Sequence, residues 1–292
     1  MPSLNSRIAG APASWGICEL PGWGYQFSPV RVLSEMKQLG LTATELGPDD
    51  FLPREPQEKV ELLATYGLTA LGAFCPLILF DTERPVRDIV QRTLETFNIL
   101  GADTMVIAAA TGTDSYDERP SLTDSQWRTL MTNLDLIAEL AESHGVTACV
   151  HPHMGTLVQT RDEVARILDG SDIPLCLDTG HITVAGGDPL EVVQSAPHRI
   201  SHVHVKDVDL ELATAVQGDR IAYSDAVRDG LYTPLGDGDL DLTAIVGVLE
   251  TSGYGGWYVP ELDQMLPADS EGMDSMSGIR RSMEFLDALL QK

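Results

Sequence analysis

Residues 146–156 (VTACVHPHMGT), followed by residues 174–181 (PLCLDTGH) and 200–207 (ISHVHVKD), decide the fold of this chain. Each run begins as an apolar strand and ends in polar side chains, and a helical pattern separates each run from the next. Parallel strands joined by helices can close into a barrel whose site lies at the C-terminal ends of the strands. The candidate ligands at these ends are His151, His153, Asp178, His181, His202, His204 and Asp207.

The alternation of strand and helix continues on both sides of this stretch and gives eight units in total. A chain of 292 residues, 43% of them hydrophobic, is long enough for one complete barrel. Parallel strands need helical crossovers, and eight of them close the sheet. We therefore predict an α/β protein with a single (β/α)8 TIM barrel domain over residues 1–292. The other strands are expected at residues 7–15, 42–47, 68–77, 104–112 and 255–263.

Several predicted helices carry sequence signals for their ends. Ser28 and Pro29 are typical of an N-cap followed by a first-turn proline, and Gly40 is expected to end that helix. Thr123 is expected to cap the longest helix. Asp188, which is followed by Pro189, is expected to cap another.

One connection is much longer than the others. Residues 208–241 follow the seventh strand and include the sequence GDRIAYSDAVRDGLYTPLGDGDLD. Long loops in compact domains are commonly functional, and a loop after a barrel strand lies on the active-site face. We expect this segment to be a lid over the site or a contact in a homo-oligomer.

The charge of the chain excludes several classes of partner. Its formal net charge is -25 and its pI is near 4.4. Such a field repels nucleic-acid phosphates and anionic membrane surfaces, so neither is an expected partner. No apolar run approaches the roughly 18 residues of a membrane span, and the first residues lack the pattern of a secretion signal. We expect a cytoplasmic enzyme that acts on a small molecule.

Four residues at strand ends suggest a metal site. Glu45, Asp178, His204 and Glu261 come from different predicted strands, and carboxylates combined with imidazoles suit a borderline divalent ion. The alternative is that each carboxylate caps a helix or pairs with a surface cation. That alternative is favoured for one residue alone, whereas the joint pattern favours a metal.

The histidines occur in alternating pairs. His202 and His204 share one face of their strand, and His151 and His153 repeat the arrangement two strands earlier. Alternation cannot decide which member of a pair has the functional role. A hydrogen-bonded core histidine is the alternative for each of them, and for His202 the two interpretations carry equal weight.

The motifs on these strands resemble those of a known family. The runs 150–156 (VHPHMGT), 177–189 (LDTGHITVAGGDP) and 199–209 (RISHVHVKDVD) are similar to those of inosose dehydratases, as are SWG, ELGP and PLGDGDLD elsewhere. Inosose dehydratases are xylose isomerase-like barrels, a superfamily that also includes ketose 3-epimerases, hydroxypyruvate isomerase and endonuclease IV. The resemblance covers nearly the whole chain.

The resemblance implies one divalent metal ion per site. Asp178, His204 and Glu261 match three ligands of the superfamily, and His151 stands where the epimerases have a glutamate. Whether His151 or His153 is the fourth ligand stays open. Manganese or cobalt is the expected ion, and zinc, iron and magnesium are alternatives.

The resemblance also implies a reaction, the dehydration of a keto-cyclitol such as 2-keto-myo-inositol in inositol catabolism. Replacing a carboxylate by His151 removes one half of the acid and base pair that an epimerase uses. An isomerase or 3-epimerase of a ketose is the alternative. For the dehydratase, Glu261 is the expected base, and His153 or Lys206 is the expected acid. The residues expected to bind substrate are Trp15, Glu45, His181 and His202, with a core aromatic as the alternative for Trp15.

Overall fold

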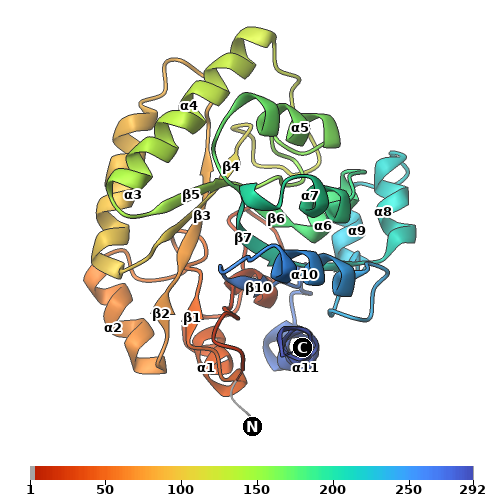
Figure 1. Cartoon of the computed structure of the whole chain (residues 1–292). Helices are drawn as coiled ribbons and strands as arrows, with labels where there is room; N and C mark the ends of the chain where they lie inside the picture. Colours follow the sequence, from red (N-terminus) through yellow and green to blue (C-terminus); the bar gives the residue numbers. More distant parts are fainter. Residues whose placement is uncertain (1–3, 292) are drawn as a thin grey trace.

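The computed structural model describes residues 4–291 and has a parallel barrel at its centre, surrounded by helices (Figure 1). Six strands form one continuous parallel sheet in the order β10-β7-β6-β5-β4-β3. A second pair, β1 and β2, is also parallel. The strands of the wall are β1 (Ala43–Thr44), β2 (Thr69–Ala70), β3 (Gly72–Leu77), β4 (Thr104–Ala109), β5 (Thr147–Val150), β6 (Leu175–Asp178), β7 (Ile200–Val205) and β10 (Tyr258–Pro260).

The sheet closes through the N-terminal segment. Ile8 forms a parallel bridge with Tyr258 on β10, and Gly10 forms one with Thr44 on β1. The N–H of Leu71, between β2 and β3, donates to the carbonyl of Thr44 at 2.8 Å. With β2 and β3 taken as one run interrupted at Leu71, these strands and the N-terminal segment make eight chain segments around the interior, which confirms the predicted (β/α)8 barrel.

The first and last strands are shorter than predicted. The expected strand over residues 7–15 is limited to the bridges at Ile8 and Gly10, and Pro12–Trp15 forms the 3-10 helix η1. Pro12 ends the ladder because proline has no N–H to donate. Similarly, β10 covers only Tyr258–Pro260 of the expected residues 255–263.

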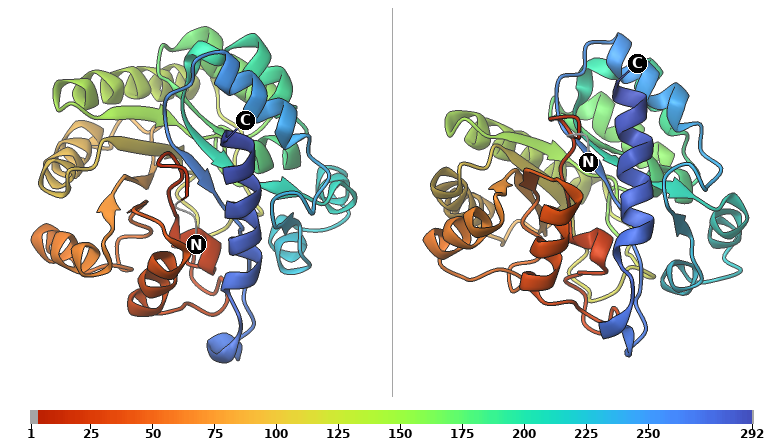
Figure 2. Two further views of the ribbon diagram at one scale, coloured as in Figure 1. Left: turned by 60° about the horizontal axis from the view of Figure 1, so that its bottom comes forward. Right: turned by 90° about the horizontal axis from the view of Figure 1, so that it is seen from below.

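The helices pack outside the wall, and their predicted caps are confirmed. Ser28 accepts a hydrogen bond from the N–H of Arg31, Thr123 forms a capping box, and Asp188 accepts from the N–H of Leu190. In Figure 2, α11 stands between α1 and α10 and completes the ring. The outer helices are α1 (Pro29–Leu39), α2 (Pro56–Tyr66), α3 (Val86–Leu100), α4 (Asp124–Ser143), α5 (Arg161–Gly170), α6 (Thr179–Val184), α7 (Pro189–Ser195), α10 (Leu242–Thr251) and α11 (Met276–Leu290). Among the described residues, no helix has the length and apolar character needed to cross a membrane.

Strand alternation divides the core into two parts. Outward-facing residues of the strands pack with the helices in the largest hydrophobic cluster, which includes Leu175, Leu177, Val203 and Val205. Three inward-facing residues, Val106, Cys149 and Cys176, form a separate interior cluster. Every residue of β4 is buried, as expected for a strand covered on both faces.

Residues 208–241 contain secondary structure of their own. An antiparallel pair connects β8 (Asp207–Val208) with β9 (Tyr232–Thr233). Two helices lie between them, α8 (Leu210–Gln217) and α9 (Tyr223–Arg228), and they project to one side of the barrel in Figure 1. The segment packs through its own hydrophobic cluster, which includes Val208, Ala213, Tyr223 and Tyr232.

A partly buried ion pair joins the N-terminal segment to α10. The guanidinium of Arg7 donates to both carboxylate oxygens of Glu250 on α10, at 3.0 and 2.5 Å, and to the carbonyl of Tyr254 at 2.9 Å. The hydroxyl of Tyr258 donates to the same carboxylate at 2.7 Å. Partial burial acts to raise the pKa of Glu250, but the hydrogen bonds from Arg7 and Tyr258 outweigh it and leave that pKa below its ordinary value.

We expect Glu250→Gln to destabilise the barrel by roughly 1–2 kcal/mol at neutral pH, because it removes the charge from a bidentate pair. A carboxyl with a lowered pKa stabilises the fold above its unfolded pKa of about 4.3, and this stabilisation is lost as the pH falls through the folded value. Urea unfolding of wild type and variant from pH 7 to 3 measures both effects. If the difference in unfolding free energy between wild type and variant stayed the same from pH 7 to 3, the Arg7–Glu250 pair would not stabilise the fold through its charge.

Candidate active site

The side chains of the site continue the inward-facing layers of the barrel. A residue two positions beyond an inward-facing residue faces the interior again, one layer nearer the C-terminal end of the strand. Four strands place a polar residue in this upper layer. The successive inward pairs are Cys149 and His151 at β5, Cys176 and Asp178 on β6, His202 and His204 on β7, and Val259 and Glu261 at β10.

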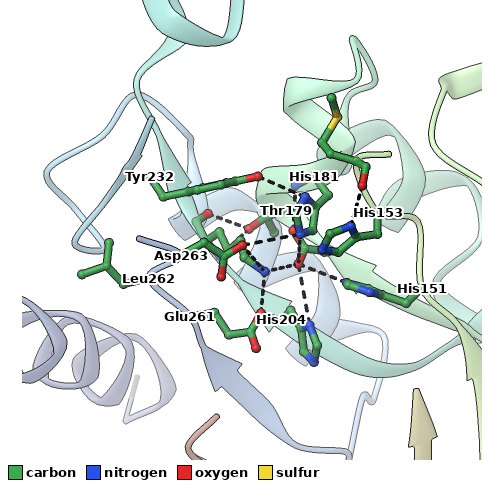
Figure 3. Close-up of polar contacts among 12 residues, drawn as sticks. His151, His153, Thr179, His181, His204, Tyr232, Glu261, Leu262 and Asp263 are labelled. Atoms are coloured by element: carbon green, nitrogen blue, oxygen red, sulfur yellow. Dashed lines mark hydrogen bonds and ion pairs between the residues drawn. The ribbon is translucent and has the colours of Figure 1, made fainter. Parts of the chain in front are cut away.

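The upper layer brings four of the predicted metal ligands together, and three of them, His151, His204 and Glu261, can be followed in Figure 3. Nε2 of His151 lies 3.2 Å from Oδ2 of Asp178. Nδ1 of His204 lies 3.7 Å from the same oxygen and 3.2 Å from Oε2 of Glu261. Ligand atoms of Asp178, His204 and Glu261 all lie within 4.8 Å of one another. The four side chains are buried and converge from adjacent strands.

The bonding of His204 fits a metal site. Its Nδ1 is buried without a hydrogen-bond partner, although it faces the carboxylates of Asp178 and Glu261. A buried nitrogen without a partner is costly, and coordination of an ion would satisfy it. Two carboxylates and two imidazoles are a donor set that borderline divalent ions accept. The residues present therefore fit a divalent metal ion.

Glu45 orients the histidines of β7 from below. Its Oε1 accepts hydrogen bonds from Nε2 of His202 at 2.8 Å and from Nε2 of His204 at 2.9 Å. The bond to His204 leaves Nδ1 as the free ring nitrogen, which is how a carboxylate fixes a metal-binding histidine. Glu45 does line the pocket, but its Oε1 is engaged by these two imidazoles.

Lys206 links the carboxylates of the site. Its buried ammonium lies 2.6 Å from Oδ2 of Asp178, contacts Oε2 of Glu261 and lies 3.6 Å from Oδ2 of Asp263. Burial acts to lower the pKa of Lys206, but Asp178 and Asp263 outweigh it and raise that pKa well above its ordinary value. Burial acts to raise the pKa of Glu261, yet the charges of His204 and Lys206 lower it to about 2.

Asp263 is a site residue that sequence reasoning missed. It lines the pocket and lies 3.6 Å from both Lys206 and Nε2 of His181. Burial raises the pKa of Asp263 to about 7, with Lys206 opposing and the carboxylate of Glu261 adding to the rise. The signal was present in the sequence, because Asp263 follows Glu261 by two positions and thus continues the same alternation.

His153 and His181 line the pocket beside the four candidate ligands. Nδ1 of His153 donates to the carbonyl of Met154 at 2.7 Å, which leaves Nε2 free, and its ring lies 3.8 Å from that of His181. Burial lowers the pKa of His153 to about 3. The hydroxyl of Tyr232 lies 3.0 Å from Nδ1 of His181. Burial also lowers the pKa of His181, and both histidines line the pocket.

The pocket above this layer has aromatic walls. Trp23, Phe74 and Tyr116 line it, and Tyr223 joins them from α9. The ring of Tyr116 lies 4.6 Å from that of His153 and 5.5 Å from that of Trp23. Sequence reasoning did not identify these residues. Trp23 and Tyr116 lie in loops that carry no periodic signal, and nothing in the patterns of β3 and α9 marks Phe74 or Tyr223 as pocket residues.

Two predicted substrate-binding residues do not reach the pocket. Trp15 has no exposed surface, and its indole N–H donates to Oε2 of Glu35 on α1 at 2.7 Å, so it is a core aromatic. His202 is buried beneath His204 and hydrogen-bonded to Glu45. Neither side chain lines the pocket, so the predicted substrate contacts of Trp15 and His202 stay untested. Trp15 lies in η1 and packs toward α1, and His202 lies one layer below His204 on its strand.

Asp207, a candidate ligand from its sequence position, has a different role. Its carboxylate accepts hydrogen bonds from the backbone N–H groups of Val208, Gly236, Gly238 and Leu240, at 2.8–3.1 Å. A Cβ on Gly238 would lie 2.4 Å from Oδ1 of Asp207, so only glycine fits there. Asp207 thus fixes the base of the long segment, and its oxygens face away from the metal ligands.

Comparison with known proteins identifies relatives along the whole barrel. The sequence profile described as xylose isomerase-like TIM barrel matches residues 33–289. An inosose dehydratase from Geobacillus thermodenitrificans is 30% identical in an alignment of 275 positions that covers 88% of this chain and 90% of that protein. An inosose dehydratase from Salmonella typhimurium is 29% identical in an alignment of 296 positions that covers 98% of this chain and 96% of that protein.

Solved structures agree with the fold. The crystal structure of the IOLI protein with a bound zinc atom superposes with a TM-score of 0.72 at 16% identity, covering 98% of each chain. At this level of identity the similarity establishes the barrel and carries no residue role.

We expect Asp178→Ala and Glu261→Ala to lower affinity for Mn²⁺ by at least roughly tenfold, because each removes a charged donor from the cluster. Asp114→Ala, which changes an exposed loop aspartate, is the matched control and should bind as wild type does. Elemental analysis after equilibrium dialysis measures the bound ion. Equal metal content in all four proteins would show that these carboxylates are not ligands.

We expect the two histidines at the end of β5, His151 and His153, to have different functions. His151→Ala is expected to lose metal affinity by roughly 10- to 1000-fold, because Nε2 of His151 faces Asp178. His153→Ala should retain the metal and lose turnover, because its free Nε2 faces the pocket. Titration calorimetry with Mn²⁺ and a turnover assay distinguish these results. The reverse pattern would exchange the two assignments.

Proposed function

The chain belongs to the inosose dehydratase branch of the xylose isomerase-like TIM barrel family, and we propose that it is a divalent-metal-dependent hydro-lyase acting on a keto-cyclitol. The proposed substrate is 2-keto-myo-inositol, an intermediate of inositol catabolism. The observation that supports this most is the buried layer of His151, Asp178, His204 and Glu261 at the floor of a pocket lined by further proton-carrying groups.

The residues that would hold the ion are His151, Asp178, His204 and Glu261, and Mn²⁺ or Co²⁺ is the ion that we propose. When bound, a divalent ion polarises the ketone and stabilises the negative charge that develops on its oxygen. Glu45 supports this arrangement through its hydrogen bond to His204. That bond presents Nδ1 toward the carboxylates.

Dehydration requires a base at the carbon next to the ketone and an acid at the leaving hydroxyl. We assign the base to Glu261, because a carboxylate that holds a metal through one oxygen keeps the other free, and the candidate ligand His204 lies beside Oε2. We assign the acid to Lys206, whose ammonium carries protons at the pocket floor. His153 is expected to accept a hydrogen bond from a substrate hydroxyl, because its neutral form has no proton on Nε2.

The long segment would complete the pocket over the substrate. Residues 208–241 supply Tyr223, which lines the pocket, and Tyr232, which contacts His181. Aromatic walls above a polar floor suit a ring with apolar carbon faces and a rim of hydroxyl groups. The segment therefore excludes water from the reacting carbons when the substrate is bound.

The reaction is tested by incubating metal-loaded protein with a panel of keto-inositols and ketoses. We expect a product that has lost one water molecule and absorbs in the ultraviolet as an enolised diketone. Mass spectrometry and absorbance measure these changes. An epimerised product of unchanged mass would instead assign the site to a ketose isomerase or 3-epimerase.

Deuterium at the carbon next to the ketone tests the first step. Removal of that deuteron by Glu261 requires it to be absent from the dehydrated product, and turnover slows if this step limits the rate. A dehydrated product that retains the deuterium would contradict the proposed proton abstraction.

A further inference from the structure

We propose that Lys206 is an internal counter-ion of the metal-free site, and that binding of a divalent ion transfers its ammonium from Asp178 and Glu261 to Asp263. Asp263 is then a positioning residue for Lys206. This inference rests on the metal site of the proposed function and is independent of the reaction catalysed there.

Lys206 engages the atoms that the metal would use. Its ammonium lies 2.6 Å from Oδ2 of Asp178 and contacts Oε2 of Glu261. The candidate nitrogen ligands face these same two oxygens, with Nε2 of His151 3.2 Å from the first and Nδ1 of His204 3.2 Å from the second. The lysine and a metal ion therefore compete for one pair of oxygen atoms.

Charge and burial make this competition strong. Asp178 and Glu261 are buried, so without a cation their charges would be uncompensated in a region of low dielectric. The ammonium provides that compensation in the metal-free chain. A divalent ion on the same oxygens would lie close to the ammonium, and their repulsion is poorly screened inside the barrel. Only one of the two cations can occupy these oxygens.

Asp263 is the group that can receive the displaced ammonium. Its Oδ2 already lies 3.6 Å from the lysine nitrogen, and the side chain lines the pocket. Its other contact in this cluster is Nε2 of His181, also at 3.6 Å. A small rotation at the end of the lysine side chain is enough to exchange partners.

The base of Lys206 is fixed, so the movement is confined to its end. Its N–H donates to Oγ1 of Thr179 at 2.8 Å, and its carbonyl accepts from that hydroxyl at 2.6 Å. A Cβ at Gly180 would lie 2.7 Å from Cβ of Lys206 and 2.9 Å from Cδ, so the stem packs directly on the first turn of α6. The ammonium can change partners without movement of the strand.

If Lys206 competes with the metal ion, removing its ammonium should strengthen metal binding. Removing a metal ligand, or an ion pair that shapes the site, should weaken it. Lys206→Met should bind Mn²⁺ roughly tenfold or more tightly than wild type, because the metal no longer has to displace an internal cation. The same variant without metal should unfold at a lower temperature, because its carboxylates are left unpaired. Lys37→Met, an exposed lysine on α1, is the matched control and should change neither quantity.

A double-mutant cycle distinguishes transfer of the Lys206 ammonium to Asp263 from a simple effect of removing the negative charge of Asp263. Asp263→Asn should weaken Mn²⁺ binding in the wild-type background, because the displaced ammonium loses its partner, and should have little effect in Lys206→Met. A simple loss of negative charge would weaken binding equally in both backgrounds. That result, or no gain of affinity in Lys206→Met, would overturn the proposal.

The wild-type protein provides a test that needs no variant to fold. The chain has four lysines, at positions 37, 59, 206 and 292. In protein labelled with ¹³C at lysine Cε, addition of Mg²⁺ or Zn²⁺ should shift the Lys206 resonance, and an unmoved resonance in the loaded protein would contradict the transfer. A wild type that binds no ion in calorimetry would instead refute the proposed metal site itself.

Discussion

Burial of like charges is the constraint on which the interior of this barrel depends. Asp178 and Glu261 lie in the top layer of the barrel, where water does not provide solvation, and Asp263 joins them from the same strand end. Such a group is stable only with cations or hydrogen-bond donors among the carboxylates. Lys206 provides one cation, and His204 provides a ring nitrogen with no other partner. The local charge balance therefore favours an additional ion.

The layer below supports the site residues. Cys149 and Cys176 belong to this layer together with His202, and Glu45 accepts hydrogen bonds from His202 and from His204 one layer above. Each site residue follows an inward-facing residue by two positions, so the strand register sets its height and direction. The pocket walls come from loops, in particular the segment anchored by Asp207. In this fold the strand ends commonly form the floor of the site, and the loops that form its walls vary between proteins.

Sequence alone predicted the barrel and the floor of the site, because both depend on local patterns. Strand ends and period-two alternation are sufficient to place Asp178 and His204 in one layer. The substrate contact predicted for Trp15 rested on the resemblance of the SWG motif, and nothing in that motif indicates that its indole N–H bonds to Glu35 on a helix. The ammonium bridge of Lys206 and the contact of Tyr232 with His181 were also not predictable. Both require the packing of segments that are far apart in the chain.

The proposed function depends on a single divalent ion at the ends of strands β5, β6, β7 and β10. Anomalous diffraction from crystals grown with Mn²⁺ tests it directly. The account predicts one strong peak per chain, in contact with Asp178, His204, Glu261 and His151. A peak elsewhere in the molecule, or no peak within the barrel at saturating Mn²⁺, would contradict it.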